Sequence, residues 1–238
     1  MEASVRRRRL EAVDPLVDEV VRAVKRVVRD EQNVVLEAVR RHRGVPSGAD
    51  VLPSIEEQDE AFADATADVL NEACAAGETL ARELGAGDGI NGDIGRRRAR
   101  ARELAASLVR QLMDPLRAKL EAALQDAVAA GDAGGDPGER VRAGYREWKG
   151  QRIDVACRDA LSVAFARGVY DAVPEGVTLR WLTTDASPCP DCADNALEHT
   201  ACGRTFPTGH FAPPAHPGCH CVAFPSDVAA EIEVVERY

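Results

Sequence analysis

The sequence predicts a mainly α-helical protein, in which long N-terminal helices are followed by a small α+β C-terminal module. The chain of 238 residues is 45% hydrophobic but only 4% aromatic, and alanine and valine supply most of the apolar content. Apolar residues recur at helical spacing in four segments of the region 1–172, and these predict helices at about 5–43, 54–84, 96–130 and 139–172. After residue 173 the sequence becomes rich in proline, glycine and cysteine. We therefore expect the helical region 1–172, a module at 173–228 and a tail at 229–238.

An apolar seam defines the first predicted helix. Its members are three and four residues apart: Leu10, Val13, Val17, Val20, Val24 and Val27. Gly44 and Pro46 mark its end. The seam fits an ordinary amphipathic helix in a bundle or a self-associating coiled coil. We favour the bundle, because a coiled coil normally sustains its heptads over a longer stretch.

The second predicted helix begins at a capping box, in which Ser54 precedes Glu57 by three residues. Cys74, on the same helix, is predicted to be a small buried apolar residue. In the third helix, leucines recur every fourth residue and mark one buried stripe: Leu104, Leu108, Leu112, Leu116, Leu120 and Leu124. Pro115 interrupts this stripe and predicts a kink or a break. Gly150 could interrupt the fourth helix.

Two basic runs, Arg6–Arg9 and Arg96–Arg102, stand at predicted helix starts, where the helix dipole disfavours positive charge. Two explanations are open: pairing with the acidic stretch Asp50–Asp93, or contact with the phosphate backbone of DNA. The acidic stretch holds twelve Asp or Glu residues and one basic residue, Arg82. We therefore expect mainly ion pairing, within the chain or between subunits.

Cysteine and histidine gather near the C-terminus, where Trp181–Pro225 holds five of the seven cysteines and four of the five histidines. A strand at Val177–Leu182 leads into Cys189-Pro190-Asp191-Cys192, and His216-Pro217-Gly218-Cys219 follows later. Both tetrapeptides read as ligand, proline, turn residue, ligand. Brought together they offer a C-x2-C and H-x2-C set, which is sulfur-rich and typical of structural zinc.

The favoured zinc ligands are Cys189, Cys192, His216 and Cys219. Cys221 is the first reserve, because it lies two residues after Cys219 and points to the same side of an extended strand. A pair of disulfides is the alternative to zinc. We favour the metal, because the number of cysteines is odd and the charged start of the chain, Met1–Arg9, is not that of a signal peptide.

The remaining candidates are His199, Cys202, His210 and His220. A second metal could use the first three, but no ligand spacing links them, so we favour a polar loop with incidental ligand types. His220 is expected to face solvent or to support a ligand. No pairing of a nucleophile with a base stands out anywhere in the sequence, and we expect no enzyme.

Composition narrows the function classes further. The formal net charge of −10 argues against a nucleic-acid binder of the simple basic type. No apolar run approaches the length of a membrane span. A zinc-dependent nucleic-acid-binding module or nuclease is kept as the alternative function, although the module holds only two basic residues between 173 and 225, Arg180 and Arg204.

The C-terminal third closes with Pro213-Pro214 and His216-Pro217-Gly218-Cys219-His220-Cys221, after the Cys189-Pro190-Asp191-Cys192 turn. With this pattern it resembles the phage Mu protein F-like, or phage head morphogenesis, family of minor capsid proteins. The resemblance covers roughly residues 150–225, and the closing motif is its most specific part. It rests on the following residues: Ala156-Cys157-Arg158-Asp159, Ala164, Gly168, Trp181, Asp185, Cys189, Cys192, Gly203, Pro213-Pro214 and His216-Pro217-Gly218-Cys219-His220-Cys221. The chain departs from the family pattern at Asp159, Gly218 and His220.

This resemblance implies a minor head protein that acts structurally in capsid assembly or in DNA packaging and ejection near the portal. The implied location is the interior of the virion head, with the host cytoplasm as the site of assembly. The implied partners are the portal protein and the inner capsid. Contact of packaged DNA with Arg6–Arg9 and Arg96–Arg102, and self-association, stay open.

Overall fold

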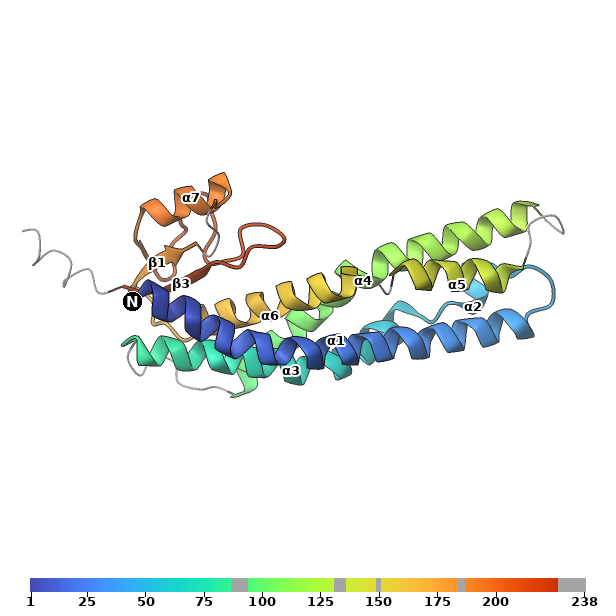
Figure 1. Cartoon of the computed structure of the whole chain (residues 1–238), viewed down its shortest axis with the longest axis horizontal. Coiled ribbons are helices and arrows are strands. Elements are labelled where there is room, and N and C mark those ends of the chain that lie inside the picture. Colours follow the sequence, from blue (N-terminus) through green and yellow to red (C-terminus); the bar gives the residue numbers. More distant parts are fainter. Residues whose placement is uncertain (87–93, 131–135, 149–150, 184–186, 227–238) are drawn as a thin grey trace, which may run out of the picture. The chain divides into compact units, whose positions relative to one another are not determined.

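The computed structural model describes residues 1–86, 94–130, 136–148, 151–183 and 187–226, and it confirms the mainly helical fold (Figure 1). The predicted tail, 229–238, lies outside the described residues. The helices are α1 (Glu2–Arg41), α2 (Gly48–Val51), α3 (Ile55–Glu83), α4 (Ile94–Ala130), α5 (Pro137–Trp148), α6 (Gln151–Asp171) and α7 (Pro190–Leu197). The strands are β1 (Thr178–Leu182), β2 (Thr200–Ala201) and β3 (Val222–Pro225).

The long helices follow the predicted pattern, except that Leu10, the first member of the predicted seam in α1, is 49% exposed. At the start of α3, the Glu57 backbone N–H donates to Ser54 Oγ and the Ser54 backbone N–H donates to Glu57, which is the predicted capping box. The leucine stripe of α4 is buried from Leu108 onward. Pro115 does not end α4, because the burial of its neighbours Leu112 and Leu116 offsets the one backbone hydrogen bond that proline removes.

Two helices differ from the prediction. The segment 139–172 forms two helices, α5 and α6, with residues 149–150 between them outside the described part. The link after the first helix contains the short helix α2. Among the described residues, none of the helices combines the length and the apolar character that a bilayer crossing requires.

The chain divides into two compact units, each built from segments that are distant in sequence. The first unit takes its described residues from Met1–Leu16, Val69–Ala101 and Asp159–Tyr238; the second consists of Val17–Asp68 and Arg102–Arg158. The C-terminal module predicted from residue 173 thus belongs to the first unit, together with the start of α1, the end of α3 and the end of α6.

The second unit is entirely helical in its described part. Its core is mainly aliphatic and includes the buried leucines of α4, together with the aromatic side chains Phe62, Tyr145 and Trp148. One buried polar contact joins three helices: the Tyr145 hydroxyl donates to Glu31 at 2.6 Å, and Gln58 Nε2 donates to the other carboxylate oxygen at 2.7 Å. A carboxylate that accepts from two partners satisfies most of its hydrogen-bonding capacity away from water.

Within the first unit, α3 and α6 cross at two glycines. A Cβ atom added at Gly168 would lie 2.0 Å from the Cys74 carbonyl oxygen, and one at Gly77 would lie 2.1 Å from the Phe165 carbonyl oxygen. Only glycine permits backbones to approach so closely. Cys74 lies at this crossing and is buried, as predicted.

The module contains a small antiparallel sheet in the order β2-β1-β3. Trp181 on β1 pairs with Ala223 on β3, and its ring packs edge-on against Phe206 at 5.0 Å between centroids. Figure 1 shows the sheet close to the N-terminal end of α1. Arg180 on β1 forms an ion pair with Glu2 at 2.9 Å, which fixes this contact.

Several arginines of the two basic runs pair inside the chain. Arg97 binds Glu78 at 2.8 Å and Arg8 binds Glu83 at 3.1 Å, and both acids belong to the acidic stretch. Arg100 binds Asp171 at 2.9 Å, outside that stretch. Intramolecular pairing therefore accounts for these three side chains, while contact with DNA stays a prediction.

Candidate metal centre

The first pair of candidate ligands lies at the start of a helix. Cys189 is the N-cap of α7 and Pro190 is its first residue, a position where the missing proline N–H costs nothing. The Cys192 backbone N–H donates to Cys189 Sγ at 3.4 Å. The turn predicted at this tetrapeptide continues into a helix of eight residues.

The second pair lies on a tight turn, as predicted. The Cys219 backbone N–H donates to the His216 carbonyl at 3.1 Å, which closes a four-residue β-turn. Gly218 has a φ of +76°, a value that glycine adopts without steric cost. Both His216 Nε2 and Cys219 Sγ lie close to Cys192 Sγ.

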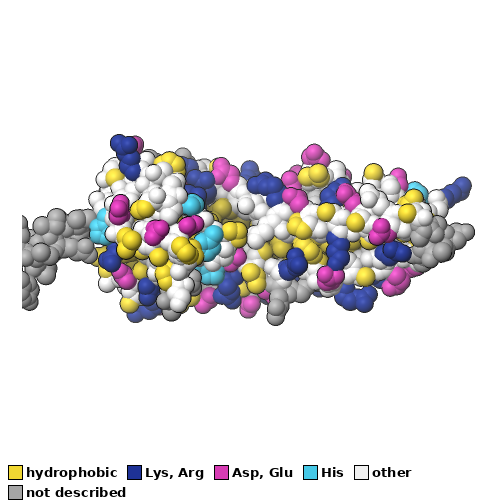
Figure 2. Space-filling model, turned by 90° about the horizontal axis from the view of Figure 1, so that it is seen from above, with side chains coloured by type: hydrophobic (Ala, Val, Ile, Leu, Met, Phe, Trp, Pro, Cys, Tyr) yellow, Lys and Arg dark blue, Asp and Glu magenta, His cyan; other side chains and the backbone are white. Residues whose placement is uncertain are grey.

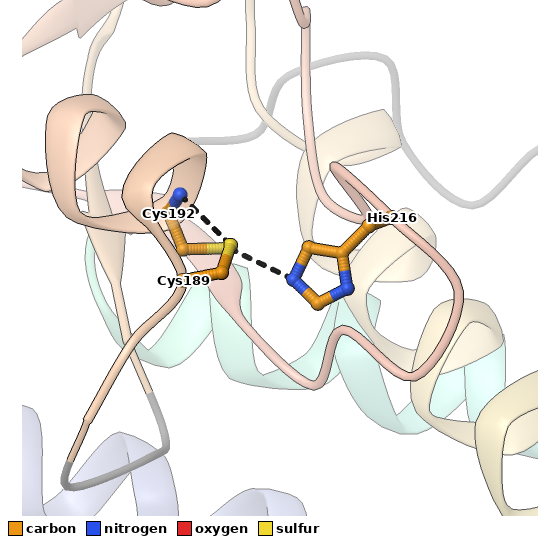
Figure 3. Close-up of side chains that lie close together, drawn as sticks. All are labelled: Cys189, Cys192 and His216. Atoms are coloured by element: carbon orange, nitrogen blue, oxygen red, sulfur yellow. Dashed lines mark hydrogen bonds between the residues drawn. The ribbon is translucent and has the colours of Figure 1, made fainter.

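The structure brings Cys189, Cys192 and His216 together (Figure 3). Among the described residues, two groups of three could hold a metal, and both contain Cys192: one is Cys189, Cys192 and His216, and the other is Cys192, Cys219 and Cys221. Within each group all donor atoms lie within 4.8 Å of one another. The sequence thus predicted all five members of the cluster.

The distances fit a tetrahedral ion. Cys192 Sγ lies 3.7 Å from Cys219 Sγ and 3.5 Å from His216 Nε2. A tetrahedron with zinc–sulfur bonds of about 2.3 Å has edges of about 3.8 Å between two sulfurs and about 3.5 Å between a sulfur and an imidazole nitrogen. These two separations from Cys192 are those of a tetrahedral site, whereas the four favoured ligands are divided between the two groups.

A hydrogen bond fixes the tautomer of His216. Its Nδ1 lies 2.8 Å from the Pro217 carbonyl oxygen, and since a carbonyl can only accept, Nδ1 carries the proton. The Nε2 atom is left with a free lone pair that faces Cys192. Imidazoles that bind metals are commonly oriented in this way, with the far nitrogen donating to a carbonyl or a carboxylate.

Burial and hydrogen bonds shift the pKa values of the thiols in the cluster in different directions. The Cys221 thiol donates to Cys219 and lowers the pKa of Cys219 to about 5, while the same bond and burial raise the pKa of Cys221. Burial raises the pKa of Cys192 to about 12, and the Cys192 backbone N–H lowers the pKa of Cys189. Cys219 is therefore the thiol that loses its proton most readily. A bound metal would displace the protons of the other ligand thiols.

The other candidates lie apart from these two groups. Among the described residues, His199, Cys202 and His210 join no group that could hold a metal. The Cys202 thiol is buried and donates to the Val173 carbonyl at 3.5 Å, and His210 contacts the Thr208 hydroxyl through Nδ1 at 2.8 Å. Figure 2 shows histidine side chains gathered over the C-terminal module.

His220 supports the cluster from outside it. It lies between Cys219 and Cys221, and its Nε2 is 2.8 Å from Asp159 Oδ1 on α6. The sequence had offered a supporting role for His220 as one of two alternatives, but it did not indicate Asp159. The two residues are 61 positions apart, and no local pattern links them.

Comparison of the chain with protein-family models, with curated proteins and with solved structures finds no match. The site is therefore interpreted from its own geometry and chemistry.

Proposed function

We propose that the Cys/His cluster is a structural zinc site with Cys189, Cys192, His216 and Cys219 as its ligands. The observation that carries this proposal is the convergence of five donors on Cys192, whose sulfur lies from His216 and from Cys219 at the edge lengths of a zinc tetrahedron. Three thiols and one imidazole form a soft donor set that suits zinc better than magnesium, calcium or manganese. Cys221 is the alternative ligand.

A structural role fits this cluster better than a catalytic one. Catalytic zinc keeps one coordination position for water, whereas four protein ligands close the shell. Here a fifth donor, Cys221, lies close enough to replace one of the four ligands. Three of the five donor residues are at most 4% exposed: Cys192, Cys219 and Cys221. Such a site offers little access for a substrate and serves to hold its module together.

On this basis the proposed biological role is that of a phage minor head protein. It would act structurally in capsid assembly, or in DNA packaging and ejection, beside the portal and the inner capsid in the virion head. The support is the resemblance of residues 150–225 to the phage Mu protein F-like family, together with a helical region and a closed metal site. DNA contact through Arg98 and Arg102, which are exposed, extends the proposal.

The alternative, a zinc-dependent nuclease, lacks a favouring observation. A nuclease would need a base and an open metal position. His199, His210 and His216 could supply a base and a metal ligand, but His199 and His210 lie outside the two groups that could hold a metal. Replacing either with alanine is expected to leave folding and particle assembly intact, and an accompanying loss of nuclease activity would contradict the structural role.

Elemental analysis of the purified chain tests the zinc site. The expected result is about one zinc per chain together with free thiols at all seven cysteines in the metal-depleted protein. Absence of zinc, with disulfides detected by mass spectrometry among Cys189, Cys192, Cys219 and Cys221, would contradict it.

Purified phage particles test the proposed role. Mass spectrometry of particles from a host that carries this sequence should detect the chain in few copies, and cryo-electron microscopy should place it beside the portal. Particles that assemble and package DNA normally without the chain would contradict the role and leave the zinc site untouched.

A further inference from the structure

Asp159 on α6 lies against the turn that carries the second pair of ligands. Its Oδ1 is 2.8 Å from His220 Nε2, and the side chains of both residues are mostly buried, with 16% of Asp159 and 26% of His220 exposed. A Cβ atom added at Gly218 would lie 4.0 Å from Asp159 Oδ2. The carboxylate therefore contacts residues 216–221, which we call the ligand segment, at His220 and approaches this segment at Gly218.

The direction of this hydrogen bond follows from its chemistry. An ionised carboxylate can only accept, so His220 Nε2 donates to Asp159. A hydrogen bond to a charged acceptor is roughly twice as strong as one between neutral groups. His220 stands between the two thiols Cys219 and Cys221, so this bond restrains the backbone that presents both sulfurs.

The ligand segment is secured on one side by the sheet. The strand β3 begins at Val222, which pairs with Leu182. Residues 210–221 before it are assigned neither helix nor strand. In this stretch the hydrogen bond from His220 to Asp159 on α6 restrains the backbone beside the donor atoms of Cys219 and Cys221.

We propose that Asp159 is a positioning residue of the metal centre, which acts through His220 to hold Cys219 and Cys221 in the geometry for binding. The inference rests on the proposed zinc site and assigns part of its affinity to a residue that does not touch the metal. Residues that orient metal ligands commonly contribute about 10–100-fold to metal affinity.

The test is a double-mutant cycle on the full chain, with Zn²⁺ affinity measured by competition with a chromogenic chelator. The variants are Asp159→Ala, His220→Ala and the double variant. Asp194→Ala is the matched control, because Asp194 is an exposed acid on α7 near Cys192. Far-UV circular dichroism of each variant reports whether α6 and the other helices are retained.

Each single variant is expected to bind Zn²⁺ about 10–100-fold more weakly than the wild type. The double variant should bind no more weakly than either single one, because both remove the same interaction. Asp194→Ala should stay within about twofold of the wild type. A merely structural role for Asp159 would lower helix content or thermal stability without this shared loss of affinity.

Asp159→Asn covers the case in which the alanine variant fails to fold. Asparagine keeps the shape and one acceptor oxygen but not the charge, so a loss of several-fold in affinity is expected. Wild-type affinity in a folded Asp159→Ala or Asp159→Asn chain, or losses that multiply in the double variant, would overturn the inference. A wild-type chain that binds no Zn²⁺ would instead refute the zinc site on which it rests.

Discussion

The helical part and the C-terminal module of this protein are stabilised in different ways. The described long helices, α1, α3 and α4, have 29 to 40 residues each and bury continuous aliphatic stripes. The module has strands of two to five residues and one helix of eight. Burial of apolar area supports long helices, whereas such short elements gain little from it.

The difference shows why the five donor residues lie where they do. A small module that cannot build a large core usually needs a cross-link, and a metal can supply one. The cluster joins the start of α7 to the turn before β3. Loss of the metal should therefore affect mainly the C-terminal module, whereas a change in packing between helices should affect mainly the helical part.

The largest expected effect comes from Cys192→Ser. Cys192 belongs to both groups that could hold a metal, and in small zinc modules the free energy of metal binding, on the order of 10 kcal/mol, is also free energy of folding. The variant should lose zinc and become sensitive to proteases between residues 178 and 225, while the helices keep their circular dichroism. Cys74→Ser, outside the cluster, is the control and should retain zinc; equal protease resistance in the two variants would contradict the account.

The second-largest effect is expected among the helices, where a change in packing should lower stability without loss of zinc. Gly168→Ala places a methyl group against the backbone of Cys74, which cannot move aside, so a loss of about 3 kcal/mol or more in the free energy of unfolding is expected. Zinc content should be retained in the folded fraction. Urea unfolding followed by circular dichroism measures the loss.

Gly144→Ala is the matched control for this crossing. There the nearest atom to an added Cβ is the end of the Leu120 side chain, at 2.8 Å, and that side chain can rotate away. Alanine also favours the helix over glycine by about 1 kcal/mol. The two changes should nearly cancel, and a loss as large as that of Gly168→Ala would show that close approach is not the cause.

The sequence predicted the long helices because their apolar periodicity extends over many turns. It did not predict α7, whose eight residues are too few for a period and whose N-cap is a cysteine. All five members of the cluster were predicted, since cysteines and histidines stand out at short fixed spacings. Asp159 was not, because a contact across 61 residues leaves no trace in local sequence.

The glycine crossing illustrates the same limit. Gly77 and Gly168 are isolated glycines inside helical patterns, which is a signal for a special packing role. The signal does not say which helix approaches which. Only the structure pairs Gly77 with the backbone of α6 and Gly168 with that of α3.

A smaller effect is expected from Tyr145→Phe in the second unit. The buried hydroxyl donates to the half-buried carboxylate of Glu31, so its removal should lower the free energy of unfolding by about 2 kcal/mol. Tyr170→Phe is the control, because its hydroxyl accepts an exposed N–H from Gly203 at 3.3 Å. Equal losses in the two variants, measured by urea unfolding, would mean that burial does not set the difference.

The smallest effects concern the basic runs. Arg97→Gln should cost about 1–2 kcal/mol, because the side chains of Arg97 and Glu78 are only 18% and 14% exposed and Arg97 also binds Asn71. Arg8→Gln removes an exposed pair with Glu83 and should cost less than about 1 kcal/mol, decreasing further with salt. Thermal unfolding at two salt concentrations separates them; a larger loss for Arg8→Gln would contradict the ranking.

The most direct test of the account is hydrogen–deuterium exchange of the full chain with and without a strong zinc chelator. Removal of zinc should abolish the protection of amides in β1, α7 and β3, while amides in the buried turns of α3 and α4 keep theirs. Restoring Zn²⁺ should restore the protection. Unchanged protection of the module after complete zinc removal would show that the metal does not hold it together.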